Sequence, residues 1–289
     1  MARQLPPARA RELIPAEALA TVPGFGPEAR VSALAGGQVN HTYRVDTAAG
    51  QFVLRWYGSM GVQALGANHA REALLQGAAA AAGVAPAVVH MDFRQRFMIC
   101  DYVEGRVWAP EDFATVGRIR QLGETLHQVH GVVAPVPAPF DLGALLRGFA
   151  ARIAREVPAE QAALAQWMAQ AQASLPKCGS EGRQGTLFHS DLHHSNILQT
   201  RQGGLVLIDW EYAAVGDPLY DLACVLAYYP QAAPYAAELL AASGLAQHAT
   251  LEMLEHATRL YALLGRLWER TRQLEADKGA GVRLPTPAD

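Results

Sequence analysis

Alternating apolar and polar positions predict a small β-rich region in the first third of the chain. Four short segments have the period-two pattern and the β-branched and aromatic content typical of strands: QVNHTYRVD, QFVLRWY, VVHMDF and RFMICDYV. The first two flank Ala48-Ala49-Gly50, so together they predict a hairpin. Between the two pairs, HAREALLQGAAAAAG has helical composition and predicts a helix that ends at Gly83.

Beyond Gly105 the pattern changes to leucine, alanine and isoleucine at three- and four-residue spacing, which is typical of helices. Five segments have this spacing: 111–131, 141–156, 159–174, 217–228 and 249–276. Two short apolar runs, TLFHSDL and LVLIDWEY, interrupt it. The whole pattern predicts an α+β protein of two lobes. Residues 1–103 would form a small antiparallel-sheet lobe with one helix, and residues 104–289 a larger, mainly helical lobe.

Composition narrows the class of protein. The chain is 51% hydrophobic and 18% charged, as expected of a globular protein with a sizeable core. A net charge of −3 gives no electrostatic reason to expect nucleic acid or an anionic membrane as partner. The three cysteines are too few and too scattered for a disulfide framework, and no apolar segment resembles a signal peptide or a membrane span. We therefore expect a soluble, cytoplasmic protein that acts on a small molecule.

The most informative segment runs from His189 to Asn196 and has the form His-x-Asp-x-x-x-x-Asn. Asp209 follows thirteen residues later, at the end of an apolar run. Phosphoryl transfer needs a carboxylate that orients the attacking hydroxyl and accepts its proton, and Asp191 fits that role. It also needs oxygen ligands that hold Mg²⁺ against the phosphates, and Asn196 and Asp209 fit those. The spacing therefore predicts a Mg²⁺-dependent phosphotransferase site.

This segment resembles the catalytic loop of the superfamily of aminoglycoside phosphotransferases, choline kinases and thiamine kinases, which are relatives of protein kinases. Asp209 takes the place of the metal-binding aspartate that opens the protein-kinase D-F-G motif. The resemblance implies the two-lobed protein-kinase-like fold, with ATP and Mg²⁺ bound in the cleft. The resemblance also implies that His189 has a structural role and supports the loop. No G-x-x-x-x-G-K-[ST] motif occurs in the chain, which excludes a P-loop ATPase.

A kinase of this type needs a glycine turn near the phosphates, a cation on the next strand and an acid that orients the cation. Gly36 and Gly37 precede the first predicted hairpin strand and fit the first need. The first 176 residues contain no lysine, so the cation must be an arginine. Arg55 lies on the second hairpin strand, and Glu72, in the predicted helix, is its expected partner.

Two further segments resemble parts of the family. MICDYVEG resembles the hinge strand, which implies that backbone groups near Asp101 to Val103 bind adenine. EYAAVGDPLYDLACVLAYY resembles the segment that follows the metal-binding aspartate. Asp217 and Asp221 would lie at the start of its helix, where a carboxylate can cap free amides. In kinase-like folds an acid here braces the catalytic loop, so the resemblance implies a structural role for Asp221.

Within the superfamily, HSDLHHSNIL followed by LVLIDWEYA is most similar to bacterial thiamine kinases. This implies transfer of the γ-phosphate of ATP to the thiamine hydroxyl, giving thiamine monophosphate. Choline or ethanolamine kinase and aminoglycoside phosphotransferase are the alternatives. A cationic alcohol would be held by aromatic faces and carboxylates, and Glu211 and Trp268 are the predicted substrate contacts.

Two hypotheses of other classes compete with an active kinase. His189 and His193 are four residues apart and could share a zinc ion, although the chain has no H-E-x-x-H motif. A kinase-like protein could also bind nucleotide without turnover. Proteins of that kind usually lose the base or a metal ligand, whereas Asp191, Asn196 and Asp209 are all present.

Overall fold

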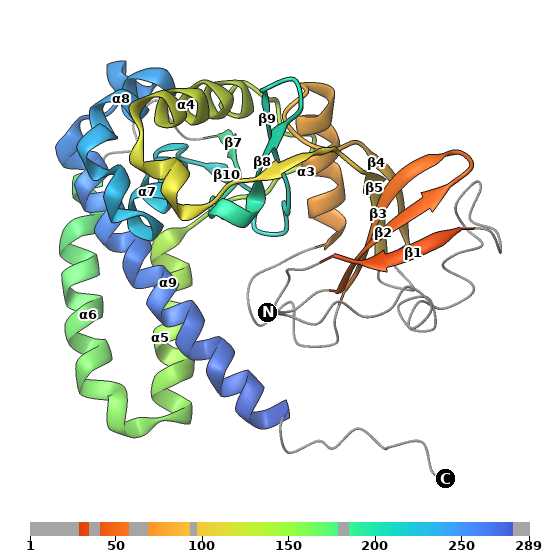
Figure 1. Cartoon of the computed structure of the whole chain (residues 1–289). Helices are drawn as coiled ribbons and strands as arrows, with labels where there is room; N and C mark the ends of the chain where they lie inside the picture. The colour runs from red at the N-terminus through yellow and green to blue at the C-terminus, as the bar shows by residue number, and fades with distance from the viewer. Residues whose placement is uncertain (1–28, 35–40, 58–68, 93–96, 179–184, 280–289) are drawn as a thin grey trace, which may run out of the picture.

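Five antiparallel strands form the sheet that the alternating segments predict (Figure 1). The computed structural model describes residues 29–34, 41–57, 69–92, 97–178 and 185–279. The strands lie in the order β1-β2-β3-β5-β4, with these bounds: β1 (Arg30–Ala33), β2 (His41–Thr47), β3 (Gly50–Trp56), β4 (Val88–Asp92) and β5 (Phe97–Asp101). All four predicted strands are confirmed. β1 was not predicted, because its sequence RVSA has a single β-branched apolar residue, and it is held by pairing with β2.

The helix predicted beside the sheet is confirmed as α3 (His69–Ala81). Its buried Leu75 and Ala79 belong to the large apolar core that continues through the C-terminal helices, whereas the sheet has a small core of its own. Gly83 follows the helix with φ +78°, in the left-handed region that favours glycine. α3 therefore connects the sheet to the rest of the molecule.

The C-terminal part is mainly helical, as its spacing predicts (Figure 1). Its longer helices are α4 (Val116–His130), α5 (Leu142–Glu156), α6 (Gln161–Ser174), α7 (Leu219–Tyr228), α8 (Ala236–Ala242) and α9 (Leu251–Gly279). The helix predicted over 111–131 is interrupted at Thr115, whose extended backbone separates a short 3₁₀ helix (Pro110–Ala114) from α4. α8 was not predicted, because seven residues are too few to show a helical repeat.

Two small sheets carry the segments that hold the candidate catalytic residues. β6 (Gly105–Val107), β8 (Ile197–Thr200) and β9 (Leu205–Leu207) form one sheet, and β7 (Thr186–Phe188) and β10 (Ala214–Gly216) form the other. β7 and β9 fall within the two predicted apolar runs, whereas β6, β8 and β10 lie outside these runs and were not predicted. Residues 189–196 follow β7 and residues 208–213 follow β9, so each candidate segment begins where a largely buried strand ends.

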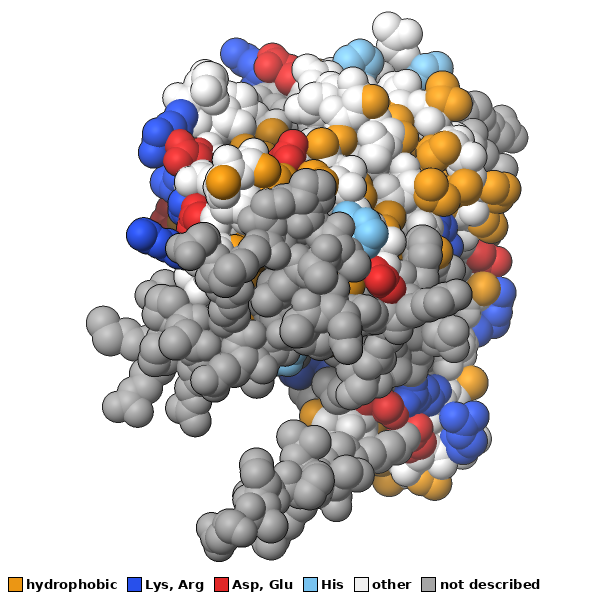
Figure 2. Space-filling view, turned by 90° about the vertical axis from the view of Figure 1, so that its right-hand side faces the viewer, with side chains coloured by type: hydrophobic (Ala, Val, Ile, Leu, Met, Phe, Trp, Pro, Cys, Tyr) orange, Lys and Arg blue, Asp and Glu red, His pale blue; other side chains and the backbone are white. Residues whose placement is uncertain are grey.

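Charged side chains of both signs are mixed over the face shown in Figure 2, and among the residues described there neither sign forms a continuous patch. This agrees with the net charge of −3. Of the helices in the described ranges, none combines the length and apolar character needed to cross a membrane.

A substitution at Gly123 on α4 would test how closely α4 packs against α8. A methyl group at this position would come within 2.5 Å of Ala242 Cβ and 3.2 Å of the Leu239 carbonyl oxygen. We expect Gly123→Ala to lower the free energy of unfolding by about 1–3 kcal/mol, the usual cost of overpacking, and to lower the urea midpoint. Gly117→Ala, also on α4, places its methyl group in open space and should raise the midpoint. Equal midpoints for the two variants would contradict this packing.

Candidate active site

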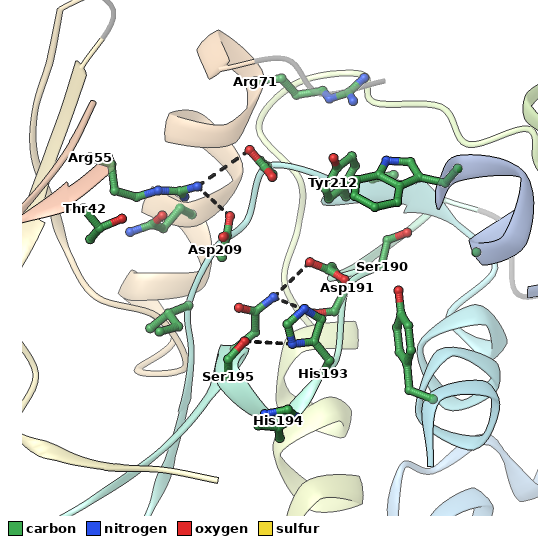
Figure 3. A pocket seen from close by; sticks show the side chains of 18 of the residues that line it. Thr42, Arg55, Arg71, Ser190, Asp191, His193, His194, Ser195, Asp209 and Tyr212 are labelled. Carbon is green, nitrogen blue, oxygen red and sulfur yellow. Dashed lines mark hydrogen bonds and ion pairs between the residues drawn. The ribbon is translucent and has the colours of Figure 1, made fainter. Parts of the chain in front are cut away.

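One cavity of about 1310 Å³ brings together most of the predicted site residues (Figure 3). The predicted residues that line it come from the five-stranded sheet, the segment after it, both candidate catalytic segments and α9: Arg55, Asp101, Val103, Asp191, Asn196, Asp209, Glu211 and Trp268. Glu72, His189 and Asp221 are buried behind this lining. Gly36 and Gly37 lie outside the described residues.

The buried carboxylate of Asp221, on α7, holds the backbone at the start of the catalytic segment. Its Oδ2 accepts a hydrogen bond from His189 N at 3.1 Å, and its Oδ1 accepts one from Ser190 N at 2.8 Å. Oδ2 also lies 3.0 Å from His130 Nε2 of α4. Ser190 has φ +66°, a conformation that non-glycine residues rarely adopt and that surrounding contacts must maintain. These contacts support the bracing role proposed for Asp221.

Further contacts hold the same segment from other elements. Tyr261 of α9 donates a hydrogen bond to the Ser190 carbonyl oxygen, and Leu192 N donates to Cys224 Sγ of α7 at 3.2 Å. His189 Nε2 lies 3.0 Å from the Ile208 carbonyl oxygen, which links the two candidate segments. The sequence did not identify His130, Tyr261 or Cys224, because each lies far along the chain in an ordinary helical pattern.

Asp191 presents its carboxylate at the cavity wall, fixed by Asn196. The Asn196 side-chain amide donates to both the carbonyl oxygen and Oδ2 of Asp191, each at 2.9 Å (Figure 3). Burial raises the pKa of the Asp191 carboxyl from an ordinary 3.8 to about 7, and the charge of Asp209 acts in the same direction. A carboxylate with a pKa near neutrality is well matched to accepting a proton from a substrate.

The oxygen atoms of Asn196 and Asp209 fit a Mg²⁺ ion. The Asn196 amide nitrogen is occupied by Asp191, which leaves its carbonyl oxygen as the group open to a metal. Asp209 has φ +65° and lines the same cavity, with Oδ1 bonded to Arg55. Carboxylate and amide oxygens are hard ligands, and Mg²⁺ commonly takes only a few of them from protein. These two residues would hold the ion against the phosphates.

Arg55 links the acids of both lobes. Its Nη1 lies 2.5 Å from Glu72 Oε1 on α3. Its Nη2 lies 2.7 Å from Asp209 Oδ1 and 3.7 Å from Glu211 Oε2 (Figure 3). Tyr57 donates to the other oxygen of Glu72 at 3.0 Å. Burial alone would lower the pKa of Arg55, but Asp209 and Glu72 outweigh it and hold that pKa well above its usual value. Arg55 is therefore a permanently charged group at the cavity wall.

The segment between β5 and β6 is the predicted hinge. Asp101 N donates to the Ala87 carbonyl oxygen and Tyr102 N to the Gln51 carbonyl oxygen, each at 3.0 Å. In the described part of the chain, Val103 N makes no hydrogen bond, and Val103 lines the cavity. Its amide is thus placed to donate to a ligand.

The opposite end of the cavity is largely aromatic and aliphatic. Trp268 lies edge-on to Tyr212, with ring centroids 6.4 Å apart. Tyr228, Tyr261 and Phe149 also line the cavity. The sequence did not predict Tyr261 or Phe149, because aromatic residues on helices are more often core. The predicted substrate contact Trp268 lies at this end, whereas Glu211 lies beside Arg55.

His189 and His193, the two candidate zinc ligands, make contacts within the protein. Both ring nitrogens of His189 contact backbone, Nε2 at Ile208 O and Nδ1 at Asp191 N. His193 Nδ1 lies 2.8 Å from Ser195 Oγ. Among the described residues, no three His, Cys, Asp or Glu side chains are arranged to hold a metal ion. The described structure therefore gives the zinc hypothesis no support.

Solved structures of small-molecule kinases share this fold. A choline/ethanolamine kinase family protein from Mesorhizobium loti is 25% identical over 93% of this chain and 88% of its own, with a TM-score of 0.71. The choline kinase LicA from Streptococcus pneumoniae, solved with AMP, is 19% identical over 91% and 89%, with a TM-score of 0.73. Spectinomycin phosphotransferase, solved with ADP and spectinomycin, is 13% identical over 89% and 90%, with a TM-score of 0.53.

The family match covers most of the chain. A family model described as "Phosphotransferase enzyme family" matches residues 30–273. That span includes Arg55 and Glu72 of the first lobe and Asp191, Asn196 and Asp209 of the second. The chain therefore belongs to the phosphotransferase enzyme family.

Proposed function

We propose that this protein transfers the γ-phosphoryl group of ATP to the hydroxyl group of a small molecule, with Mg²⁺ as the metal ion. The observation that carries the proposal is the position of the Asp191 carboxylate. It faces a cavity that also contains Asn196, Asp209 and the permanently charged Arg55. Base, metal ligands and phosphate-binding cation are the groups that phosphoryl transfer requires.

Transfer is direct. The Asp191 carboxylate accepts the proton of the substrate hydroxyl. At the same time the hydroxyl oxygen of the substrate attacks the γ-phosphorus, and the bond from the γ-phosphorus to the β–γ bridging oxygen breaks, which releases ADP. Mg²⁺, when bound, neutralises charge on the phosphate oxygens. Arg55 orients the phosphates, Glu72 fixes Arg55, and the Val103 amide donates to adenine. No phosphoenzyme is involved, because the sequence motif implies no nucleophile other than the substrate hydroxyl.

Thiamine is our proposed acceptor, with choline or ethanolamine as the second candidate. The aromatic end of the cavity, with Trp268 and Tyr212, supports a flat or cationic alcohol. The similarity to choline/ethanolamine kinase family proteins favours the second candidate. An aminoglycoside carries several ammonium groups, and the few carboxylates at this end do not favour it.

We also place the boundary between the two lobes near residue 103. β5 ends at Asp101 and β6 begins at Gly105, so the chain passes from the first sheet to the second over three residues. Val103 lies in this connection and lines the cavity. A nucleotide bound there would contact both lobes.

The test of the function is ATP consumption by the purified protein with Mg²⁺, against thiamine, choline, ethanolamine, aminoglycosides and simple sugars. Turnover with thiamine alone supports the narrow assignment. Turnover with another alcohol keeps the catalytic assignment and replaces the acceptor. Binding of ATP with no turnover across the panel would favour the non-catalytic hypothesis.

Two variants separate chemistry from nucleotide binding. Asp191→Ala should lower kcat by roughly 10²–10⁴-fold, because the base is lost, with the ATP dissociation constant little changed. Asp209→Ala should abolish Mg²⁺-dependent nucleotide binding. Asp277→Ala, which removes an exposed carboxylate on α9, is the matched control and should behave as wild type. Full turnover by both active-site variants would show that the loop has been assigned wrongly.

The raised pKa of Asp191 makes stability depend on pH. A carboxyl whose folded-state pKa is about 7 binds its proton more tightly in the folded than in the unfolded chain. The stability that the folded protein gains from the protonated Asp191 carboxyl is therefore complete below about pH 4 and is lost as the pH rises through 7. Asp191→Asn should gain stability over wild type between pH 5 and pH 8, by roughly 2–4 kcal/mol. Urea unfolding in EDTA without nucleotide measures this, and parallel pH profiles for the two proteins would contradict it.

A further inference from the structure

Two helix-interior glycines face the aromatic end of the cavity. Gly148 lies within α5 and Gly265 within α9, and both line the cavity. α5 and α9 pack against each other along the C-terminal part (Figure 1). The two glycines thus lie on neighbouring helices that share one part of the cavity wall.

Neither glycine is required by its own backbone or by packing. Neither has a positive φ. A Cβ built at either position would meet no atom within 4 Å, whereas at Gly123 and Gly105 it would clash with a neighbouring element. Glycine in a helix interior is much less favourable than alanine. Because both positions line the cavity, a side chain at either one would extend into it, and glycine leaves that space open.

The walls around that space are apolar and aromatic. α5 contributes Ala144, Leu145 and Phe149, while α9 contributes Leu264 and Trp268, all within four residues of one of the two glycines.

The charged groups at this end of the cavity already have protein partners. Glu269 pairs with Arg272 at 2.7 Å, and Asp141 accepts the Ala144 amide at 2.8 Å as the N-cap of α5. Arg152 pairs with Glu156 at 3.3 Å. The space therefore suits an apolar or aromatic group better than a polyhydroxylated or multiply charged one.

We propose that the space between α5 and α9 is the acceptor subsite for an alcohol that carries a flat aromatic ring, and that Gly148 and Gly265 determine this specificity. This rests on the proposed kinase function. The ring lies against the two Cα atoms and beside Trp268, and the hydroxyl arm extends toward Asp191. A methyl group on either helix would occupy the volume of the ring, while a small alcohol without a ring would still fit.

The experiment compares Gly148→Ala and Gly265→Ala with Gly77→Ala, a helix-interior glycine of α3 that does not line the cavity and also has open space at its Cβ. Each variant should raise the melting temperature, by about 2 °C, because alanine favours helix. Calorimetry with Mg²⁺ and a non-hydrolysable ATP analogue then measures binding of three probes: thiamine, pyridoxine and choline.

We expect wild type to bind at least one of the ring alcohols, thiamine or pyridoxine. Gly148→Ala and Gly265→Ala should weaken that binding roughly tenfold or more, the usual effect of a misplaced methyl group in a pocket. Gly77→Ala should bind as wild type does, and choline binding, where wild type shows it, should be unchanged in all three variants.

Other results overturn the proposal. It is wrong if the two cavity variants bind the ring alcohols as wild type does, if they lose choline equally, or if wild type binds neither ring alcohol. A lowered melting temperature for both cavity variants would show that the glycines have a packing role instead. Ring binding that Gly148→Ala and Gly265→Ala weaken, without any turnover in wild type, would keep the subsite and reject the kinase function.

Discussion

A buried carboxylate, Asp221, holds the segment that carries the candidate base. It accepts two backbone amides, His189 N and Ser190 N, and so maintains a left-handed conformation at Ser190 that a serine would not adopt alone. An unpaired carboxylate at this depth would be very costly, so loop and helix must form together. Tyr261 secures the next carbonyl group, and the direction of the Asp191 side chain follows from these contacts.

Arg55 is the second group that fixes the geometry of the cavity. Its two terminal nitrogens contact Glu72 of the first lobe and Asp209 of the second, so one guanidinium joins the sheet to the catalytic segments. A lysine has a single ammonium group and could not reproduce both contacts. One of the acids that hold Arg55, Asp209, also raises the pKa of Asp191, since its charge adds to the effect of burial. The proposed base, cation and metal ligands therefore form one electrostatic unit.

The sequence predicted the α+β fold and the catalytic segment, because both depend on local pattern. The spacing from His189 to Asp209 is set by one loop and one short hairpin, and strand alternation is visible over five or more residues. β1, β6, β8 and β10 lie outside the alternating and apolar segments that the sequence shows, and they were missed. Tyr261 and Gly148 could not have been identified, because their importance comes from contacts between distant segments. The choice of acceptor remains a proposal for the same reason.

The most direct measurement of the central claim is the kcat of Asp221→Asn, with the alcohol that wild type phosphorylates fastest. An asparagine can accept one of the two backbone amides but offers an N–H to the other, so the Ser190–Asp191 backbone should lose its geometry. The account predicts a fall in kcat of roughly 10²-fold or more, with the dissociation constant of an ATP analogue within about threefold of wild type. A folded Asp221→Asn protein with the kcat of wild type would contradict it.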